Sequence, residues 1–310
     1  MKIIFMGTPE PAAKCLQVLI EAKEEIIAVI TQPDRPKGRG LKLTPSPVKE
    51  LALKNDMRIL QPEKLKDKVL TAEIRSLAPE LIVVVAYGNI IPKEILDIPK
   101  YGCINVHASL LPRYRGAAPI QYAIMKGEKE TGVTIFKLSE TLDTGDIISQ
   151  VKVPIDIEDT SRTLFPKIFD AAAKLLVHTI RLIKEGKAGA VKQNDKGATY
   201  APTLKREQGV IDWKQPARSI YNKIRAFDPW PGAHTYHNDK TLKIWRSEVV
   251  ERDKGVPGKI SDIMKGEGFV IGAGEGSLLV LEVQPQAGKR MSAYQFAIGH
   301  ELKVGDNLPS

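Results

Sequence analysis

Short apolar runs alternate with helical patterns over the first 187 residues of the chain. Residues 2–7, 25–31 and 80–88 form runs of strand length that are almost continuously apolar. Such runs are typical of parallel strands covered on both faces. Residues 9–23 and 161–186 carry apolar side chains at helical spacing. The alternation predicts an α/β fold with a doubly wound parallel sheet.

The pattern changes beyond residue 187. Residues 188–206 are polar, basic and rich in Gly and Ala, which is typical of a linker. A helical pattern at 212–227 comes next. Short strand-like runs separated by Gly-containing turns then follow at 242–250, 258–264, 268–274 and 276–285. These runs predict a small β-barrel. The sequence therefore divides into domains 1–187 and 207–310 with a linker between them.

Charge and cysteine content narrow the class of protein. The chain has 310 residues and a formal net charge of +9, which favours an anionic partner, although a generally lysine-rich protein would look the same. Cys15 and Cys103 show no C-x-x-C or metal-ligand spacing, so we expect a reducing compartment and no disulfides. Gly7 ends the first apolar run too early for a signal peptide, and no apolar run approaches the roughly 20 residues that span a bilayer. These features predict a cytoplasmic protein.

Nucleotide-binding fingerprints are absent from the sequence. The first strand–turn–helix, FMGTPEPAAK, lacks G-x-G-x-x-G, and no G-x-x-x-x-G-K-[ST] occurs. The sheet is therefore predicted to be Rossmann-like without a dinucleotide or P-loop site.

Polar side chains follow a buried-looking strand in GCINVHASLLPRYRG, residues 102–116. Asn105 and His107 are two residues apart and should point to the same side of that strand. The segment LDTGD follows another predicted strand and can bring Asp143 to the same edge. An amide that binds an oxyanion, an imidazole that moves a proton and a carboxylate that orients it suit acyl transfer to an amine.

Structural roles explain the same residues without chemistry. His107 can be a hydrogen-bonded core histidine and Asn105 a turn former. Cys103 is a possible nucleophile, but a small packing residue fits its position better. His234 and His237 are close in sequence, but no third metal ligand is evident, so a loop role is favoured.

The ordered motifs Asn-x-His, Ser-Leu-Leu-Pro and Leu-Asp-x-Gly resemble those of the 10-formyltetrahydrofolate-dependent formyltransferase family. The stretches FMGTP, TQPDRPKGRGLKLTPSPVKELA, VVVAYGNIIP, IDW and IRAFDPWPGA extend the resemblance over most of the chain. They are similar to the members of that family that formylate initiator methionyl-tRNA. Pro11 and Tyr114 depart from the common Phe and Trp of the family, which bears on local packing.

The resemblance implies a Rossmann-like catalytic domain, a linker and a C-terminal OB-like barrel that binds tRNA. It implies transfer of the formyl group of 10-formyltetrahydrofolate to the amino group of methionine on initiator methionyl-tRNA, giving N-formylmethionyl-tRNA for translation initiation. Asn105, His107 and Asp143 match the catalytic positions, with Asn105 and protonated His107 at the oxyanion. No metal is required. The same resemblance implies a monomer without an obligatory protein partner or a membrane.

Two sets of binding residues follow from the same resemblance. The implied folate contacts are Ser109, Leu110, Leu111, Pro112, Tyr87, Gly88 and Ile90. The implied tRNA contacts are Arg35, Lys37, Arg39 and Lys42, in a basic loop at 33–47 with Arg39 at the recognition position. A solvated loop with ordinary charges is the alternative for that stretch.

Other functions of the same fold give different expectations. A formyltransferase for a sugar-nucleotide amine, or a formyltetrahydrofolate hydrolase, would not need the basic loop at 33–47. A tRNA-binding module without catalysis would not need Asn105, His107 and Asp143 together.

Overall fold

The computed structural model describes residues 1–37, 42–250 and 255–310 and divides into two compact units. The N-terminal unit comprises Met1–Gly116, Thr131–Pro154 and Pro166–Ala201. The C-terminal unit comprises Ala117–Glu130, Ile155–Phe165 and Pro202–Ser310. Each unit is built from several separate segments of the chain. The division into domains 1–187 and 207–310 with a linker at 188–206 stays a prediction.

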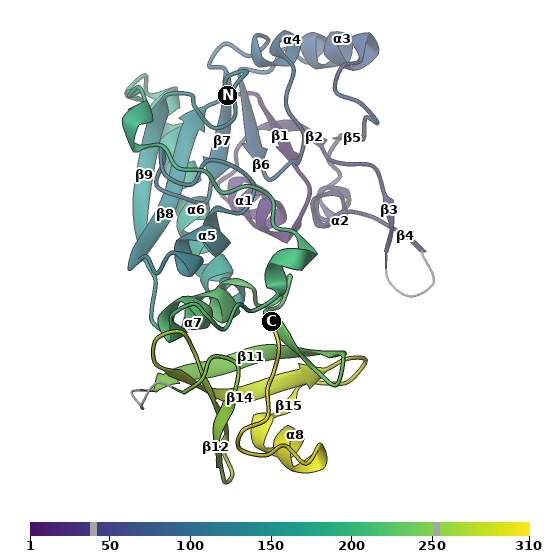
Figure 1. Ribbon diagram of the computed structural model, residues 1–310. Helices are drawn as coiled ribbons and strands as arrows, with labels where there is room; N and C mark the ends of the chain where they lie inside the picture. Colours follow the sequence, from purple (N-terminus) through teal and green to yellow (C-terminus); the bar gives the residue numbers. More distant parts are fainter. Residues whose placement is uncertain (38–41, 251–254) are drawn as a thin grey trace. The chain divides into compact units, whose positions relative to one another are not determined.

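A seven-stranded sheet forms the centre of the N-terminal unit (Figure 1). In sheet order its strands are β5 (Ile59–Leu60), β2 (Ile26–Ile30), β1 (Ile3–Gly7), β6 (Leu81–Val85), β7 (Cys103–His107), β8 (Glu130–Lys137) and β9 (Ile147–Pro154). The first five are parallel, which confirms the predicted sheet, and β8 pairs antiparallel with β7.

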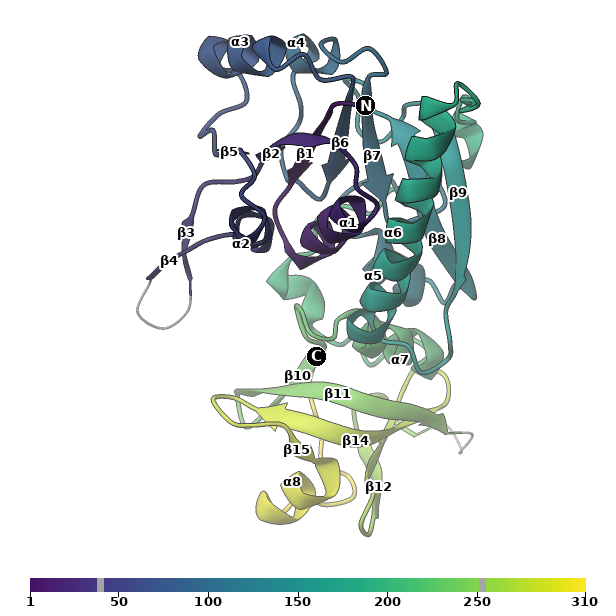
Figure 2. The ribbon, with the colours of Figure 1, turned by 180° about the vertical axis from the view of Figure 1, so that it is seen from behind.

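Helices cover both faces of this sheet. Ile4 and Met6 of β1 join a buried cluster with residues of α3 (Lys68–Ser76) and α4 (Lys93–Leu96). Gly7 faces the other way, where a Cβ would lie 2.7 Å from the Cβ of Ala12 in α1 (Glu10–Glu21). The helix α6 (Ser161–Lys184) lies beside α1 (Figure 2), and an ion pair between Lys14 and Asp170 joins them. The fully apolar burial of β1 and β6 explains their continuous hydrophobic runs.

The basic loop contains a two-stranded ribbon. β3 (Arg35–Lys37) pairs antiparallel with β4 (Lys42–Thr44), and α2 (Pro47–Lys54) follows. At the base of the ribbon, Asp34 accepts hydrogen bonds from Lys49 at 2.7 Å and from Gln61 at 2.9 Å. Arg39, which the sequence places at the centre of this stretch, lies outside the described residues.

An antiparallel sheet forms the core of the C-terminal unit (Figure 1). Its order is β10 (His234–His237), β11 (Lys240–Val250), β14 (Ser277–Pro285), β13 (Gly268–Gly272) and β12 (Ile260–Met264), with β15 (Met291–Ser292) paired to β14. The unit also holds α5 (Pro119–Met125), the 3₁₀-helix η2 (Arg206–Gly209), α7 (Ala217–Ala226) and α8 (Ala293–Gly299). The four strands predicted here are all present. Of the helices described, none is both long and apolar enough to cross a membrane.

Two arginines surround the buried carboxylate of Asp228 in the C-terminal unit. Its Oδ1 accepts hydrogen bonds from Arg162 and Arg290, each at 2.8 Å. The Arg290 guanidinium also lies 3.9 Å over the Trp245 ring. Burial alone would raise the pKa of Asp228, but the hydrogen bonds from the two arginines outweigh it and lower that pKa.

We expect Asp228→Asn to lower the free energy of unfolding near neutral pH by about 1–3 kcal/mol, because both arginines would face a neutral amide. The pKa of Asp228 is lower in the folded protein, so its charge stabilises the fold above the ordinary Asp pKa and loses this effect as the pH falls through the folded value. Urea denaturation of both proteins over a falling pH series should show their difference shrinking. A difference that stays constant into the acid range would contradict this account.

Candidate functional site

The strand β7 presents Asn105 and His107 at its carboxyl end. The two residues alternate with Ile104 and Val106, so their side chains point to the same side of the sheet. Asn105 is half-buried, and its side chain forms no hydrogen bond with another described residue. His107 is only 6% exposed. The strand therefore brings the Asn105 amide and the buried His107 ring to the same side of the sheet.

Both ring nitrogens of His107 face oxygen atoms. Nε2 lies 2.9 Å from the carbonyl oxygen of Tyr114, and Nδ1 lies 3.7 Å from Oδ2 of Asp143. A carbonyl oxygen only accepts hydrogen bonds, so Nε2 carries a proton and donates it there. Nδ1 is left facing the carboxylate. The edge of the Phe136 ring covers the imidazole at a centroid distance of 6.4 Å.

Asp143 reaches His107 from the loop between β8 and β9. This carboxylate is 8% exposed, and its Oδ2 accepts a hydrogen bond from the backbone N–H of Gly116 at 2.8 Å. Its φ of +52° lies in the left-handed region. Because β8 is antiparallel to β7, the strand ends beside Ile104, and the loop must carry Asp143 back toward His107. The expected route along a parallel strand is wrong, although the expected neighbours do meet.

The predicted folate residues after β6 include both buried and exposed groups. Tyr87 is 3% exposed, and its hydroxyl has no hydrogen-bond partner among the described residues. Burial raises the pKa of this phenol to about 12. Gly88 has a φ of +91° and open space where a Cβ would be. Ile90 is 81% exposed and is available as an apolar contact.

The predicted folate segment 109–112 is shaped by β8 and β9. The Ser109 hydroxyl is buried and donates to the carbonyl oxygen of Arg113 at 2.6 Å. Thr134 of β8 donates to the carbonyl oxygen of Ser109 and accepts from the N–H of Leu111. Gln150 of β9 donates to the carbonyl oxygen of Leu111 at 2.9 Å. The Ser109 side chain therefore holds the segment's shape from inside.

Several residues that hold this site were missed by sequence reasoning. Arg115 is buried and donates to Gln193 and Asp195, and Thr199 binds the N–H groups of Tyr114 and Arg115. Gln193 and Thr199 fall in the stretch interpreted as a linker, and no spacing or motif there signals a contact with residues 114–116.

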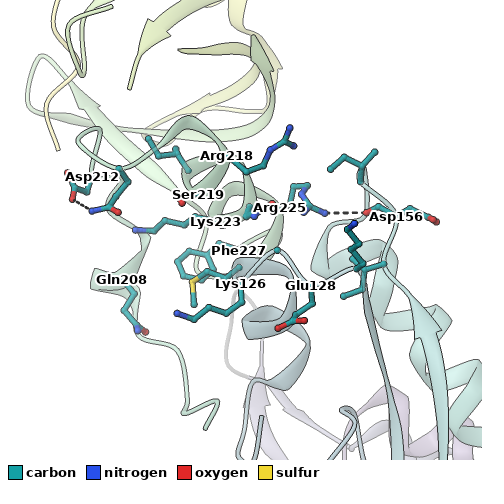
Figure 3. Close-up of a pocket in the computed structure, with 18 residues that line it drawn as sticks. Lys126, Glu128, Asp156, Gln208, Asp212, Arg218, Ser219, Lys223, Arg225 and Phe227 are labelled. Carbon is teal, nitrogen blue, oxygen red and sulfur yellow. Dashed lines mark hydrogen bonds between the residues drawn. The ribbon is translucent and has the colours of Figure 1, made fainter. Parts of the chain in front are cut away.

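A cavity of about 1010 Å³ lies in the C-terminal unit (Figure 3). Its walls come from α7, from the turn at 125–129 and from residues 155–157. Charges of both signs line it, including Lys223 and Asp212. Burial lowers the pKa of Lys223, whose ammonium donates to the carbonyl oxygen of Val210. None of the residues predicted for catalysis or binding lines this cavity.

The close contact at Gly116 gives a test of how the site is held. A Cβ on Gly116, where φ is +120°, would lie 2.7 Å from the carbonyl oxygen of Ala201. Gly186 has a φ of +66° but nothing within 4 Å of such a Cβ. We expect Gly186→Ala to cost about 1–2 kcal/mol from the backbone conformation alone. Gly116→Ala should cost about 1–3 kcal/mol more. Urea denaturation measures the free energy of unfolding of both variants. Equal losses would show that residues 199–201 move away from the added methyl group at no cost.

Comparison with known proteins gives consistent matches along the whole chain. Residues 1–180 match the formyl transferase family, and residues 203–301 match its C-terminal domain. The methionyl-tRNA formyltransferase of Caldanaerobacter subterraneus subsp. tengcongensis is 47% identical over 99% of this chain and 100% of its own length. That of Geobacter sulfurreducens is also 47% identical, over 99% of this chain and 96% of its own.

Solved structures share the fold at lower identity. An N-formyltransferase from Helicobacter canadensis superposes with a TM-score of 0.68 and 23% identity, covering 90% of this chain and 98% of its own. A methionyl-tRNA formyltransferase from Clostridium thermocellum gives 0.55 and 22%, covering 81% and 94%. Taken with the two matched domains and the full-length relatives, the chain belongs to the formyl transferase family.

Proposed function

We propose that this protein transfers the formyl group of 10-formyltetrahydrofolate to the amino group of methionine on initiator methionyl-tRNA. The product, N-formylmethionyl-tRNA, serves translation initiation. The observation that carries the proposal is the 47% identity to methionyl-tRNA formyltransferases over 99% of the chain. The contact of Asp143 with His107, which is two residues from an Asn105 amide that no other described residue bonds, gives it a chemical basis.

Asn105 is proposed to bind the developing oxyanion. The bound donor supplies a formyl group, and the methionine amine attacks its carbon while the carbonyl electrons move onto oxygen. An amide N–H aimed at that oxygen stabilises the charge as it forms. Asn105 suits this role because its side chain is held on a rigid strand and is not used by a neighbouring described residue.

His107 is proposed to move the proton. Its Nε2 is occupied by the carbonyl oxygen of Tyr114, so Nδ1 is the nitrogen that can take a proton from the attacking amine. Asp143 then faces a positively charged ring and stabilises it. The same proton can pass to the folate nitrogen as the bond to the formyl carbon breaks. The histidine returns to its neutral form.

The residues after β6 fit a folate. An exposed Ile90 offers an apolar surface for a flat ring, and Gly88 leaves room for close approach to the backbone. The Tyr87 hydroxyl, which no other described residue bonds, adds a polar group at the same strand end. These features support the folate contacts implied at Tyr87, Gly88 and Ile90.

The positive charge of the chain supports tRNA as the molecule that carries the acceptor amine. The chain has a net charge of +9, and Arg35 is exposed at the start of the β3–β4 ribbon. A basic ribbon can contact phosphates or an unpaired base. The solved sugar N-formyltransferases are 23–24% identical to this chain. That level of identity shows a shared fold and does not indicate a shared acceptor.

An acceptor comparison tests the proposed function. Radiolabelled formyl-tetrahydrofolate would be incubated with the protein and with methionyl-tRNA, free methionine or an amino sugar nucleotide. The label should appear on methionyl-tRNA only. Transfer to the amino sugar instead would favour the sugar-nucleotide formyltransferase, and binding of tRNA without transfer would favour the non-catalytic tRNA-binding module.

We expect Asn105→Ala to lower kcat by roughly 10²–10³-fold, the usual cost of one oxyanion donor. KM for both substrates should change little, because the lost interaction forms in the transition state. Steady-state kinetics on folded protein, verified by circular dichroism, measures this. Wild-type turnover in the variant would remove Asn105 from the mechanism.

We expect Arg39→Ala to lower kcat/KM for methionyl-tRNA while leaving the folate KM unchanged. If Arg39 binds a phosphate, the slope of log affinity against log salt should become shallower by roughly 1. If it stacks on a base, the slope should change less and discrimination among tRNAs should relax. Arg75→Ala, an exposed arginine on α3, is the control. Equal tRNA kinetics in the two variants would leave the basic stretch at 33–47 as a solvated surface feature.

A further inference from the structure

Residues 193–201 pack against the stretch that holds the proposed catalytic pair. The N–H of Tyr114 donates to the Thr199 hydroxyl at 2.8 Å, and the N–H of Arg115 donates to the Thr199 carbonyl oxygen at 2.8 Å. The N–H of Ala201 donates to the carbonyl oxygen of Arg115 at 2.7 Å. This part of the chain lies between the two segments matched to the family, at 1–180 and 203–301.

Gln193 connects this segment to Asp143. Its side-chain Nε2 donates to the carbonyl oxygens of Asp143 at 2.9 Å and of Gly145 at 2.8 Å. Its Oε1 accepts from Nε and NH2 of Arg115 at 3.2 and 2.8 Å. Both ends of the amide are thus fully used, and Gln193 is 6% exposed.

These contacts close a ring of interactions around the carboxylate. The N–H of Gly116 donates a hydrogen bond to the Asp143 carboxylate, and the side chain of the neighbouring Arg115 donates to Gln193. Gln193 in turn donates to the backbone carbonyl oxygen of Asp143. Asp143 needs such support because a non-glycine residue at φ +52° occupies an unfavourable conformation. A ring that fixes both its backbone and its side chain sets the carboxylate relative to His107.

We propose that Gln193 is a positioning residue that places Asp143 against His107 for formyl transfer. The inference rests on the proposed function, since it assigns Gln193 a role in that reaction. Gln193 does not contact substrate: it is buried, and each of its donors and acceptors is engaged by the protein. Its effect therefore reaches the reaction through Asp143.

Gln193→Glu changes the contacts to the Asp143 loop while keeping those to Arg115. The carboxylate keeps the size of the side chain but leaves two carbonyl oxygens without a donor, so the melting temperature should fall while the protein stays folded. The substitution also places an acceptor where Nε2 now donates to two carbonyl oxygens, which repels the Asp143 loop. We expect kcat to fall about 10–100-fold, as for a displacement of catalytic groups by up to about 1 Å. KM for folate and for methionyl-tRNA should stay within about 2-fold, because only transition-state contacts are weakened.

A double-mutant cycle tests whether Gln193 acts through Asp143. In an Asp143→Ala background, Gln193→Glu should slow transfer by less than about 2-fold, since the group it positions is gone. Gln193→Leu removes the hydrogen bonds without adding charge. It should also slow transfer by less than about 2-fold in the Asp143→Ala background. Thr179→Ala is the control, because it removes a buried hydroxyl that bonds only the Leu175 carbonyl oxygen within α6. It should leave kcat unchanged even if stability falls.

The ¹⁵N chemical shifts of the His107 ring give a readout without any acceptor. Gln193→Glu and Asp143→Ala should displace these signals in the same direction, and Thr179→Ala should not. The inference would be overturned by a normal kcat in both Gln193 variants or by His107 signals that do not move. It would also be overturned if the rate loss of the double mutant equals the product of the two single losses. A KM effect without a kcat effect would also overturn it. If the wild type fails to formylate methionyl-tRNA but the His107 signals respond as expected, the proposed function fails while the positioning contact stands.

Discussion

Two backbone groups on either side of Arg115 hold the His107 ring and the Asp143 carboxylate in place. The Tyr114 carbonyl oxygen accepts from the His107 ring, and the Gly116 N–H donates to the Asp143 carboxylate. Tyr114 and Gly116, two residues apart, thus hold both partners from one short stretch of backbone. A pair held in this way does not have to reorganise when charge develops beside it, which is the basis of electrostatic preorganisation.

The sheet supplies the rigid part of the site, and loops supply the rest. Asn105 and His107 belong to β7, which is paired on both sides by β6 and β8. Asp143 lies in a loop that packs tightly against the sheet, since a Cβ on Gly145 would collide with the Lys137 carbonyl oxygen. Gln193 then holds this loop by donating hydrogen bonds to the carbonyl oxygens of Asp143 and Gly145. Rigid strands fix the amide and the imidazole, while the carboxylate depends on contacts from three separate parts of the chain.

Much of this could be predicted from the sequence, because the decisive signals are local. The continuous apolar runs of β1 and β6 follow from burial on both faces, and the two-residue spacing of Asn105 and His107 follows from strand geometry. The glycine-punctuated runs beyond residue 240 likewise give the antiparallel strands. The order of the motifs along the chain identifies the family. All of these features except the order of the motifs depend on residues that are close in sequence.

Only the tertiary structure decided how distant segments meet. The direction of β8 reverses the route by which Asp143 reaches His107. β8 is buried along almost its whole length, as the parallel strands are, so its apolar pattern does not reveal that it runs antiparallel. The buried hydroxyl of Ser109 turns inward because Arg113 offers it a carbonyl oxygen. Gln193 looks like part of a polar linker, yet it is buried against Arg115 and Asp143. Polar residues read as solvent-exposed from composition, and only a partner brought near by the fold can satisfy them in the interior.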